Sequence, residues 1–380
     1  MTRYGNILTL FLLLLFTARC TVEFIPEINE NRESLVVEGM ITDQDRPNSI
    51  RLSRSLPLGK PLVRKPVRGA VVTITDENAN VSVLQELKPG IYSTDSLQFR
   101  GRIGGKYSLG IKINDAEYSS DFIEMKPVPP ISSLYYEKVD IVTSADSNRM
   151  EQGCRIYLDT HDPAGECLYY RWNYVETYEY NVPYDVLNKK CWVTEKSNKI
   201  LIKNTSVLNQ ATIKKYQVNY IDNYSDKLKE KYSILVSQYS ISEQEYEFWQ
   251  KVQNISQNVG GLYDFTPVVV PGNVISTTDP KEVVLGYFSV SAVTQKRLFI
   301  KDKFMGLPVF FTYCATDTIT GMLPEQGLNV NYWVLEDYSD EVPPFWVVST
   351  FRECADCTTR GLKFGHYSGN EKTAADEARY

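Results

Sequence analysis

The sequence predicts a mainly β protein, in which an N-terminal β-sandwich is followed by a larger β-rich domain with one inserted amphipathic helix. Most apolar segments are short and alternate with polar residues at a period of two, which is typical of half-buried strands. Glycine, proline, asparagine and aspartate separate these segments at short intervals. Only one segment, near residues 242–259, combines helical periodicity with helix-capping signals.

Residues 1–19 have the pattern of a secretory signal peptide. Arg3 gives a positive start, residues 7–16 form an apolar core, and small residues lead to Cys20. The core has about 10 residues, whereas a membrane-spanning helix needs about 20. No later stretch is apolar for long enough to span a bilayer. We therefore expect export, with residues 1–19 removed.

Cys20 directly follows this apolar core and resembles the lipobox cysteine of bacterial lipoproteins. Thr17 and Arg19 depart from the usual lipobox residues, so ordinary signal cleavage is the alternative to lipidation of Cys20. Residues 20–33 are polar and acidic, and we expect them to tether the lipid to the fold. Six further cysteines are candidates for up to three disulfides, with no pairing assigned: Cys154, Cys167, Cys191, Cys314, Cys354 and Cys357.

The charge balance excludes some partners. Removal of residues 1–19 takes away two arginines and changes the net charge from −6 to about −8. An acidic chain of this kind is not expected to bind nucleic acid or an anionic lipid surface.

The first domain is expected over residues 34–126. Its strand-like segments are rich in β-branched residues and are separated by turns: 35–42, 49–53, 69–76, 91–92 and 107–113. The segment Lys126-Pro127-Val128-Pro129-Pro130 follows, and its three prolines favour an extended linker. We place the domain boundary there.

The second domain is expected over residues 131–357, before a loose tail at 358–380. Its clearest strand, 169–180, has Tyr170, Trp172 and Tyr174 on one face and Arg171 and Asn173 on the other. The aromatic stripe either forms part of the core, which we favour, or is exposed to bind a glycan or peptide. Further strands are expected at 131–139, 154–159, 232–239, 283–289, 297–300, 308–313, 332–335 and 345–350.

The one helix is expected to begin with a capping box. Ser242 stands at the N-cap and Glu245 at the third helical position, from which its side chain can reach back. Phe248, Val252 and Ile255 form an apolar stripe, and the glycine pair 260–261 is expected to end the helix.

No set of residues predicts catalysis, a metal site or a cofactor. The two histidines, His161 and His366, lack an adjacent nucleophile and base in the sequence pattern. The CxxC pair Cys354 and Cys357 allows three interpretations: zinc, redox chemistry or structural disulfides. Zinc needs two further ligands and a redox site needs a helix start, so we favour structural disulfides, within the pair or to Cys191 or Cys314.

An ordered series of motifs resembles the family called domain of unknown function 4249. The motifs are LVVEGMITD at 35–43, GAVVTI at 69–74, YRWNYVET at 170–177, YSILV at 232–236, EYEFW at 245–249, VLGYF at 284–288, KRLFI at 296–300 and the CxxC at 354–357. The likeness runs from about residue 20 to 357. Cys154 and Cys167 lie beyond the family's usual cysteines, which implies that these two pair with each other.

The resemblance implies a location and a role but no catalytic residues. Such proteins resemble outer-membrane lipoproteins of Bacteroidetes-type bacteria, and the first domain resembles immunoglobulin-like or prealbumin-like sandwiches. The family implies a non-enzymatic accessory of a TonB-dependent transporter in nutrient uptake, facing the periplasm or the cell surface. A structural or assembly lipoprotein of the envelope, without a small-molecule ligand, is the alternative.

Overall fold

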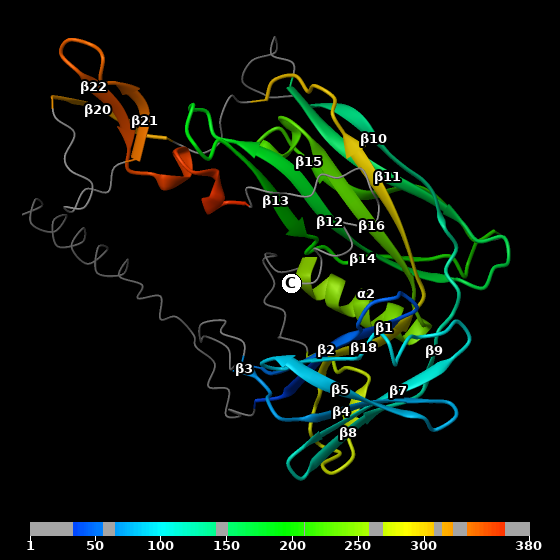
Figure 1. Cartoon of the computed structure of the whole chain (residues 1–380). Coiled ribbons are helices and arrows are strands. Elements are labelled where there is room, and N and C mark those ends of the chain that lie inside the picture. The colour runs from blue at the N-terminus through cyan, green and yellow to red at the C-terminus, as the bar shows by residue number, and fades with distance from the viewer. Residues whose placement is uncertain are drawn as a thin grey trace, which may run out of the picture.

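The computed structural model describes residues 33–55, 65–141, 151–208, 210–257, 269–307, 314–321 and 333–361. Within these ranges the chain is mainly β with one α-helix, as the sequence predicts (Figure 1). The segment 1–32, which contains the expected signal peptide and Cys20, lies outside the described residues, as do the expected strand at 308–313, the glycine pair 260–261 and His366.

The first sheet is a nearly closed, barrel-like layer. Nine strands follow one another in the order β17-β8-β7-β4-β5-β6-β2-β1-β18, and two short strands, β3 and β9, pair at its side. The N-terminal part of the chain supplies β1 (Leu35–Thr42), β2 (Ser49–Arg54), β3 (Lys65–Pro66), β4 (Val71–Asp76), β5 (Val81–Lys88), β6 (Ile91–Ser93), β7 (Lys106–Ile113), β8 (Ala116–Ser120) and β9 (Ile123–Glu124).

Two strands of this sheet come from much later in the chain. These are β17 (Val274–Ser276), which pairs with β8, and β18 (Leu285–Ser291), which lies parallel to β1. The backbone N–H of Gly272 donates to the Val284 carbonyl at 2.9 Å and brings the two ends of the sheet together. The sheet that begins in the expected first domain, 34–126, is therefore completed from within the expected second domain.

The register of β1 with β18 depends on a glycine. Val37 is paired with Gly286 and Gly39 with Phe288. Gly286 has a φ of +82°, and a Cβ at this position would lie 2.1 Å from the Val37 carbonyl oxygen. A side chain at position 286 would therefore clash as well as strain the backbone, so only glycine allows this approach.

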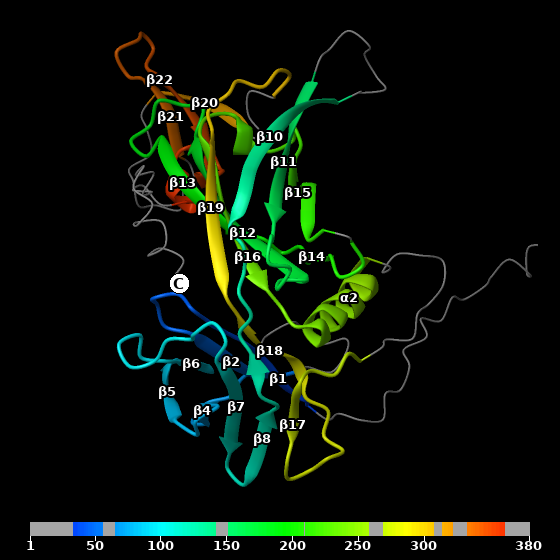
Figure 2. The ribbon, with the colours of Figure 1, turned by 90° about the vertical axis from the view of Figure 1, so that its right-hand side faces the viewer.

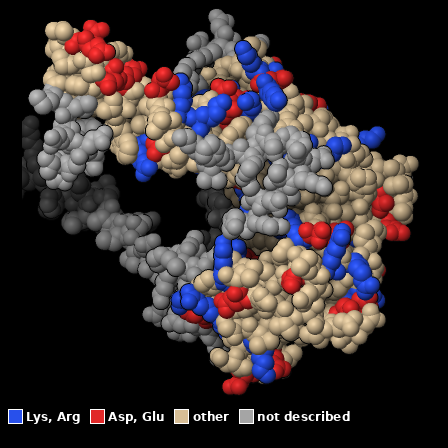
Figure 3. Space-filling view, viewed as in Figure 1, with Lys and Arg blue, Asp and Glu red and all other residues tan. Residues whose placement is uncertain are grey.

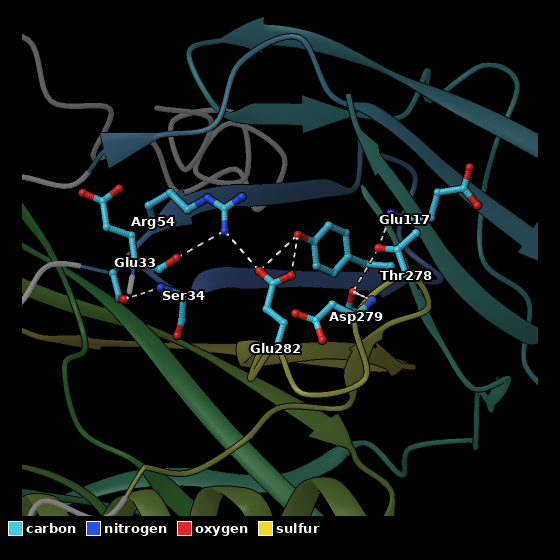
Figure 4. Close-up of polar contacts among 10 residues, drawn as sticks. Glu33, Ser34, Arg54, Glu117, Thr278, Asp279 and Glu282 are labelled. Carbon is cyan, nitrogen blue, oxygen red and sulfur yellow. Dashed lines mark hydrogen bonds and ion pairs between the residues drawn. The ribbon is translucent and has the colours of Figure 1, made fainter. Parts of the chain in front are cut away.

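A small polar cluster joins the returning segment to the first sheet (Figure 4). The Glu282 carboxylate accepts hydrogen bonds from Arg54 of β2 at 3.2 Å and from the Tyr118 hydroxyl of β8 at 3.0 Å. The Glu117 carbonyl accepts from the Thr277 backbone N–H at 2.8 Å. The loop between β17 and β18 is thus tied to strands on both sides of the closure.

The middle of the chain, together with β19, forms two antiparallel sheets that pack around a shared core, called here the second core (Figure 2). One contains β10 (Ile131–Ile141), β11 (Glu151–His161) and β15 (Thr212–Ile221). The other contains β13 (Lys190–Lys196), β12 (Tyr169–Asn181), β16 (Tyr232–Ser240) and β19 (Val293–Ile300), with β14 (Leu201–Asn204) paired to β12 and η1 (Asp226–Leu228) before β16.

Helix α2 (Glu243–Gln257) lies between the first sheet and the sheet of β12 and β16 (Figures 1 and 2). Half of the predicted capping box is present, because the Ser242 hydroxyl accepts from the Glu245 backbone N–H at 3.1 Å. The Glu245 carboxylate, which was expected to reach back to the N-cap, instead contacts Arg171, Trp249 and Ser289. Phe248 of the expected apolar stripe is buried, whereas Ile255 is 38% exposed. No helix within the described ranges is both long and apolar enough to cross a membrane.

A small third unit follows at the C-terminal end. Its strands are β20 (Thr316–Thr320), β22 (Phe345–Ser349) and β21 (Trp333–Tyr338), followed by η2 (Arg352–Cys354) and η3 (Cys357–Thr359). The last residues of the described chain, up to 361, thus include η3, where a loose tail was expected from 358.

The CxxC cysteines form two separate disulfides. Cys357 is bonded to Cys191 at the edge strand β13, and Cys354 is bonded to Cys314 before β20. The structural interpretation of this motif is confirmed, and both partners lie among those the sequence analysis allowed.

The implied disulfide between Cys154 and Cys167 is wrong. Both cysteines are unpaired and are 0% and 1% exposed. They lie in the second core, between the two antiparallel sheets. Burial raises the pKa of each thiol to about 12, which keeps both in the unreactive neutral form. They pack as small apolar side chains, which the count of cysteines could not distinguish from bonded ones.

Asp356, between the CxxC cysteines, connects the C-terminal segment 352–359 to the loop between β12 and β13, where Asn188 lies. Burial would raise the pKa of this carboxyl, but hydrogen bonds from Thr358, Arg352 and Asn188 outweigh it and lower the pKa to about 2. The Arg352 guanidinium lies 2.9 Å from the Asp356 carboxylate, and the Asn188 amide 3.1 Å from it.

We predict that Asp356 contributes to stability above pH 3.8 and loses this contribution as the pH falls through about 2, because its pKa is lower in the folded chain than the ordinary 3.8. The contribution is about 2 kcal/mol, from about 1.4 kcal/mol per pKa unit. Urea unfolding at several acidic pH values measures it, with Asp337→Asn in exposed β21 as the control. An unchanged pH dependence in Asp356→Asn would contradict this assignment.

Candidate functional site

A cleft of about 990 Å³ lies between the outer face of the first sheet and the wall formed by β12, β16 and α2. Its size is at the upper end of the range for ligand pockets, about 300–1,000 Å³. Its lining includes Glu38, Met40, Thr42, Arg46, Asn48, Ser49, Arg51, Ser93, Arg171, Asn173, Tyr239, Glu245, Phe248, Trp249, Val252, Tyr287 and Ser289.

The alternation of β1 produces the floor of the cleft. Val37 and Ile41 point into the core of the first sheet and are fully buried. Their neighbours Glu38 and Met40 therefore face the opposite side and line the cleft. Tyr287 and Ser289 occupy the equivalent face of β18, so the paired strands β1 and β18 present one continuous surface.

A buried ion pair forms the opposite wall. Arg171 of β12 lies 3.6 Å from the Glu245 carboxylate of α2, and their side chains are 22% and 1% exposed. The Arg171 guanidinium stacks 3.8 Å from the centre of the Trp249 ring. Trp249 Nε1 and Ser289 Oγ both donate to the Glu245 carboxylate, at 3.0 and 2.5 Å. This unit links β12, α2 and β18.

Burial determines the electrostatics of this pair. Desolvation raises the pKa of Glu245, and the attraction of Arg171 and the hydrogen bonds only partly oppose it. Desolvation likewise lowers the pKa of Arg171. Because one oxygen of Glu245 is engaged by Arg171 and Trp249 of the wall and the other by Ser289 of the floor, we interpret the carboxylate as a structural group of the cleft.

Neutral polar groups cover much of the remaining surface. The Tyr239 hydroxyl donates to the Asn173 amide oxygen at 3.3 Å, and the hydroxyls of Ser49 and Ser93 lie 2.8 Å apart. The Asn48 amide oxygen accepts from the backbone N–H of Thr42 at 2.8 Å. These contacts hold the polar side chains in defined orientations.

The predicted aromatic stripe does not reach this cleft. Tyr170, Trp172 and Tyr174 are 0%, 1% and 4% exposed and belong to the second core, between the two antiparallel sheets. The interpretation of this stripe as an exposed binding surface is therefore wrong, and the favoured core interpretation holds. The opposite face of the same strand supplies Arg171 and Asn173 to the cleft.

Sequence reasoning missed Arg171, Glu245 and Trp249 as parts of one site. The alternation along β12 correctly placed Arg171 opposite the aromatic stripe, and the capping pattern correctly placed Glu245 in the first turn of α2. No signal in the sequence indicated that the Glu245 carboxylate would turn toward Arg171 and Ser289 of other elements.

Among the described residues, the remaining candidates do not come together in a second site. His161 contacts the Thr212 hydroxyl at 2.8 Å on an exposed surface. Within the described residues, no group of three or more histidine, cysteine or acidic side chains could hold a metal ion. Acidic and basic side chains lie interspersed over the face shown in Figure 3.

The comparison with family models matches residues 21–297 to the family described as "Domain of unknown function (DUF4249)". This is well over half of the chain, so the protein belongs to that family. The match includes the first sheet, α2 and the residues of the cleft, and it ends before the C-terminal unit with the CxxC motif. No curated protein matches the sequence.

We predict that Glu245→Ala destabilises the fold by about 3–5 kcal/mol, because it leaves the Arg171 charge buried without its partner. Urea unfolding measures this loss. Arg51→Ala is the matched control, because Arg51 pairs with Glu38 at 3.7 Å while both side chains are about half exposed, and its loss should cost about 1 kcal/mol or less. Equal costs in the two variants would contradict the structural role of the buried pair.

Proposed function

We propose that this protein is a non-catalytic lipoprotein of the outer membrane, anchored through Cys20, that binds a ligand in the cleft as an accessory of a TonB-dependent transporter in nutrient uptake. The observation that carries the proposal is the cleft itself. It is large, its polar groups are held by mutual hydrogen bonds, and its wall contains a buried ion pair. Pre-formed polar groups beside apolar surface are the usual features of a small-molecule site.

Three further observations support the location and the class of partner. The first residues of the sequence have the signal-peptide pattern followed by Cys20. The chain also belongs to the DUF4249 family, and the resemblance to that family is what implies an envelope lipoprotein. Two disulfides suit an oxidising compartment. We further propose that the barrel-like first sheet is related to immunoglobulin-like or prealbumin-like sandwiches.

We predict that the full chain, tagged at its C-terminus and extracted gently with detergent, co-purifies with a TonB-dependent β-barrel receptor. Mass spectrometry of the eluate identifies the receptor, with an untagged strain as the control. Repeated extractions that return no barrel would contradict the accessory role and leave the structural lipoprotein as the better account.

Lipidation is tested in the same strain by incorporation of radiolabelled palmitate. The wild type should carry label, and Cys20→Ala should carry none. Cys154→Ala is the control, because it removes another cysteine that forms no disulfide, and it should be labelled like the wild type. Equal labelling of Cys20→Ala and the wild type would remove the lipid anchor from the proposal.

A further inference from the structure

The C-terminal unit presents one open face of its three-stranded sheet. Along β22, Trp346 and Val348 are buried, at 7% and 0% exposure. Phe345 and Val347 alternate with them and are partly exposed, so they point to the opposite face, which solvent reaches. Figures 1 and 2 show that the unit lies beside β13, at the other end of the molecule from the first sheet.

Two exposed aromatic residues stand on this open face. Residues directly opposite each other on antiparallel strands share a face, and Tyr338 is paired with Phe345 while Trp333 is paired with Ser349. Trp333 and Tyr338 are 40% and 39% exposed. Four residues of β22 separate the two pairs, so the backbone positions of Trp333 and Tyr338 lie about 13 Å apart, at about 3.3 Å per residue.

Neighbouring side chains support each ring on one side. Tyr338 stacks on Phe345 with ring centroids 4.5 Å apart and an angle of 16° between the ring planes. The Arg352 guanidinium lies over the Trp333 ring at 5.2 Å from its centre, and Arg352 is itself paired with Asp356 at 2.9 Å. Because one side of each ring is covered, the exposed area lies on the other side and at the edges. The two rings are therefore supported platforms with an open side.

Hydrogen-bonding groups lie beside these rings on the same face. Thr316, Thr318 and Thr320 of β20 pair with the β22 residues of the open face, and all three are exposed. Glu336 stands between the two rings along β21, is exposed, and accepts from the Tyr338 hydroxyl at 3.0 Å. The face thus combines two aromatic platforms with a carboxylate and a row of hydroxyls.

This combination suits a neutral sugar chain. A sugar ring has an apolar C–H side that packs on an aromatic ring, and hydroxyls at its rim that donate and accept hydrogen bonds. Arg352 is already paired with Asp356, and Glu336 forms no ion pair within the described ranges, so the face repels anions. A proline-rich segment has no backbone N–H to donate to Glu336, and an extended peptide adds to a sheet edge rather than a face.

We propose that this open face of the C-terminal unit binds a neutral oligosaccharide. Two sugar rings of one chain pack on Trp333 and Tyr338, and sugar hydroxyls donate to Glu336 and exchange hydrogen bonds with the threonines of β20. The site lies outside the family match, which ends at residue 297, and outside the cleft. It is a second binding site, and it does not depend on the ligand of the cleft.

The test is isothermal titration calorimetry of the full chain, purified in detergent, with cellohexaose, xylohexaose and maltohexaose. At least one hexaose should bind, and the matching disaccharide should bind at least about 10-fold more weakly, because it contacts one ring at a time. Trp333→Ala and Tyr338→Ala should each weaken binding about 10-fold, whereas Trp333→Phe and Tyr338→Phe keep a ring and should retain most of the affinity.

A third variant covers the case in which removal of a ring disturbs the unit. Glu336→Lys changes an exposed side chain between the two rings, where the cost to stability is small, and should also weaken binding about 10-fold. Tyr224→Ala and Phe122→Ala are the matched controls, because they remove rings that are 65% and 54% exposed outside this face, and they should bind like the wild type. Urea unfolding verifies that each variant is folded.

The absence of binding by all three hexaoses would overturn the inference, as would wild-type affinity in the variants of Trp333, Tyr338 and Glu336. Hexaproline amide is titrated under the same conditions, and its binding in place of every hexaose would assign the face to peptides instead.

A variant of the cleft separates this inference from the proposed function. Val252→Arg places a long charged side chain in the cleft from α2. Loss of hexaose binding in Val252→Arg, with binding retained in Trp333→Ala, would place the sugar in the cleft. That result would overturn the second site and leave the ligand-binding role of the cleft intact. The accessory role is tested independently by co-purification of the receptor.

Discussion

The parallel pairing of β18 with β1 is the contact on which the rest of the arrangement depends. It joins residues almost 250 positions apart in the sequence, with Val36 opposite Leu285 and Thr42 opposite Ser291. Gly286 permits the close approach, and the hydrogen bonds from Arg54 and Tyr118 to Glu282 hold the loop that precedes β18. Because the chain must return to this position, the elements between residues 126 and 274 are closed into a loop anchored at both ends on the first sheet.

The cleft is a direct consequence of this closure. Helix α2 precedes the returning segment, and β19 follows it and pairs with β16, so the chain on both sides of β18 belongs to the part of the fold that faces β1 and β18 across the cleft. Ser289 of β18 donates to Glu245 of α2, which in turn pairs with Arg171 of β12. Three elements from distant parts of the sequence therefore share one buried carboxylate. If the polar floor and the ion-paired wall moved apart, the Glu245 carboxylate would lose its hydrogen bond from Ser289.

Local features of the fold could be predicted from the sequence, because they depend on near neighbours. The strand at 35–42, the alternation of β12 and the Ser242 cap all follow from periodicity and short-range hydrogen bonding. The pairing of β1 with β18 could not be predicted, since nothing in either segment specifies the other. The sequence offered Cys191 and Cys314 as possible disulfide partners but could not assign either of them to Cys354 or Cys357. The burial and pairing of the Glu245 carboxylate could not be predicted either, because its partners Arg171 and Ser289 lie on other elements.

Native-state hydrogen exchange tests the central role of the β1–β18 pairing most directly. If this pairing holds the first sheet closed, the amides of β18 and those of β1 and β2 should become exchangeable in the same opening event, with the same free energy and the same dependence on denaturant. The result that would contradict the account is exchange of the β18 amides through a separate opening of lower free energy, while β1 and β2 remain protected up to global unfolding.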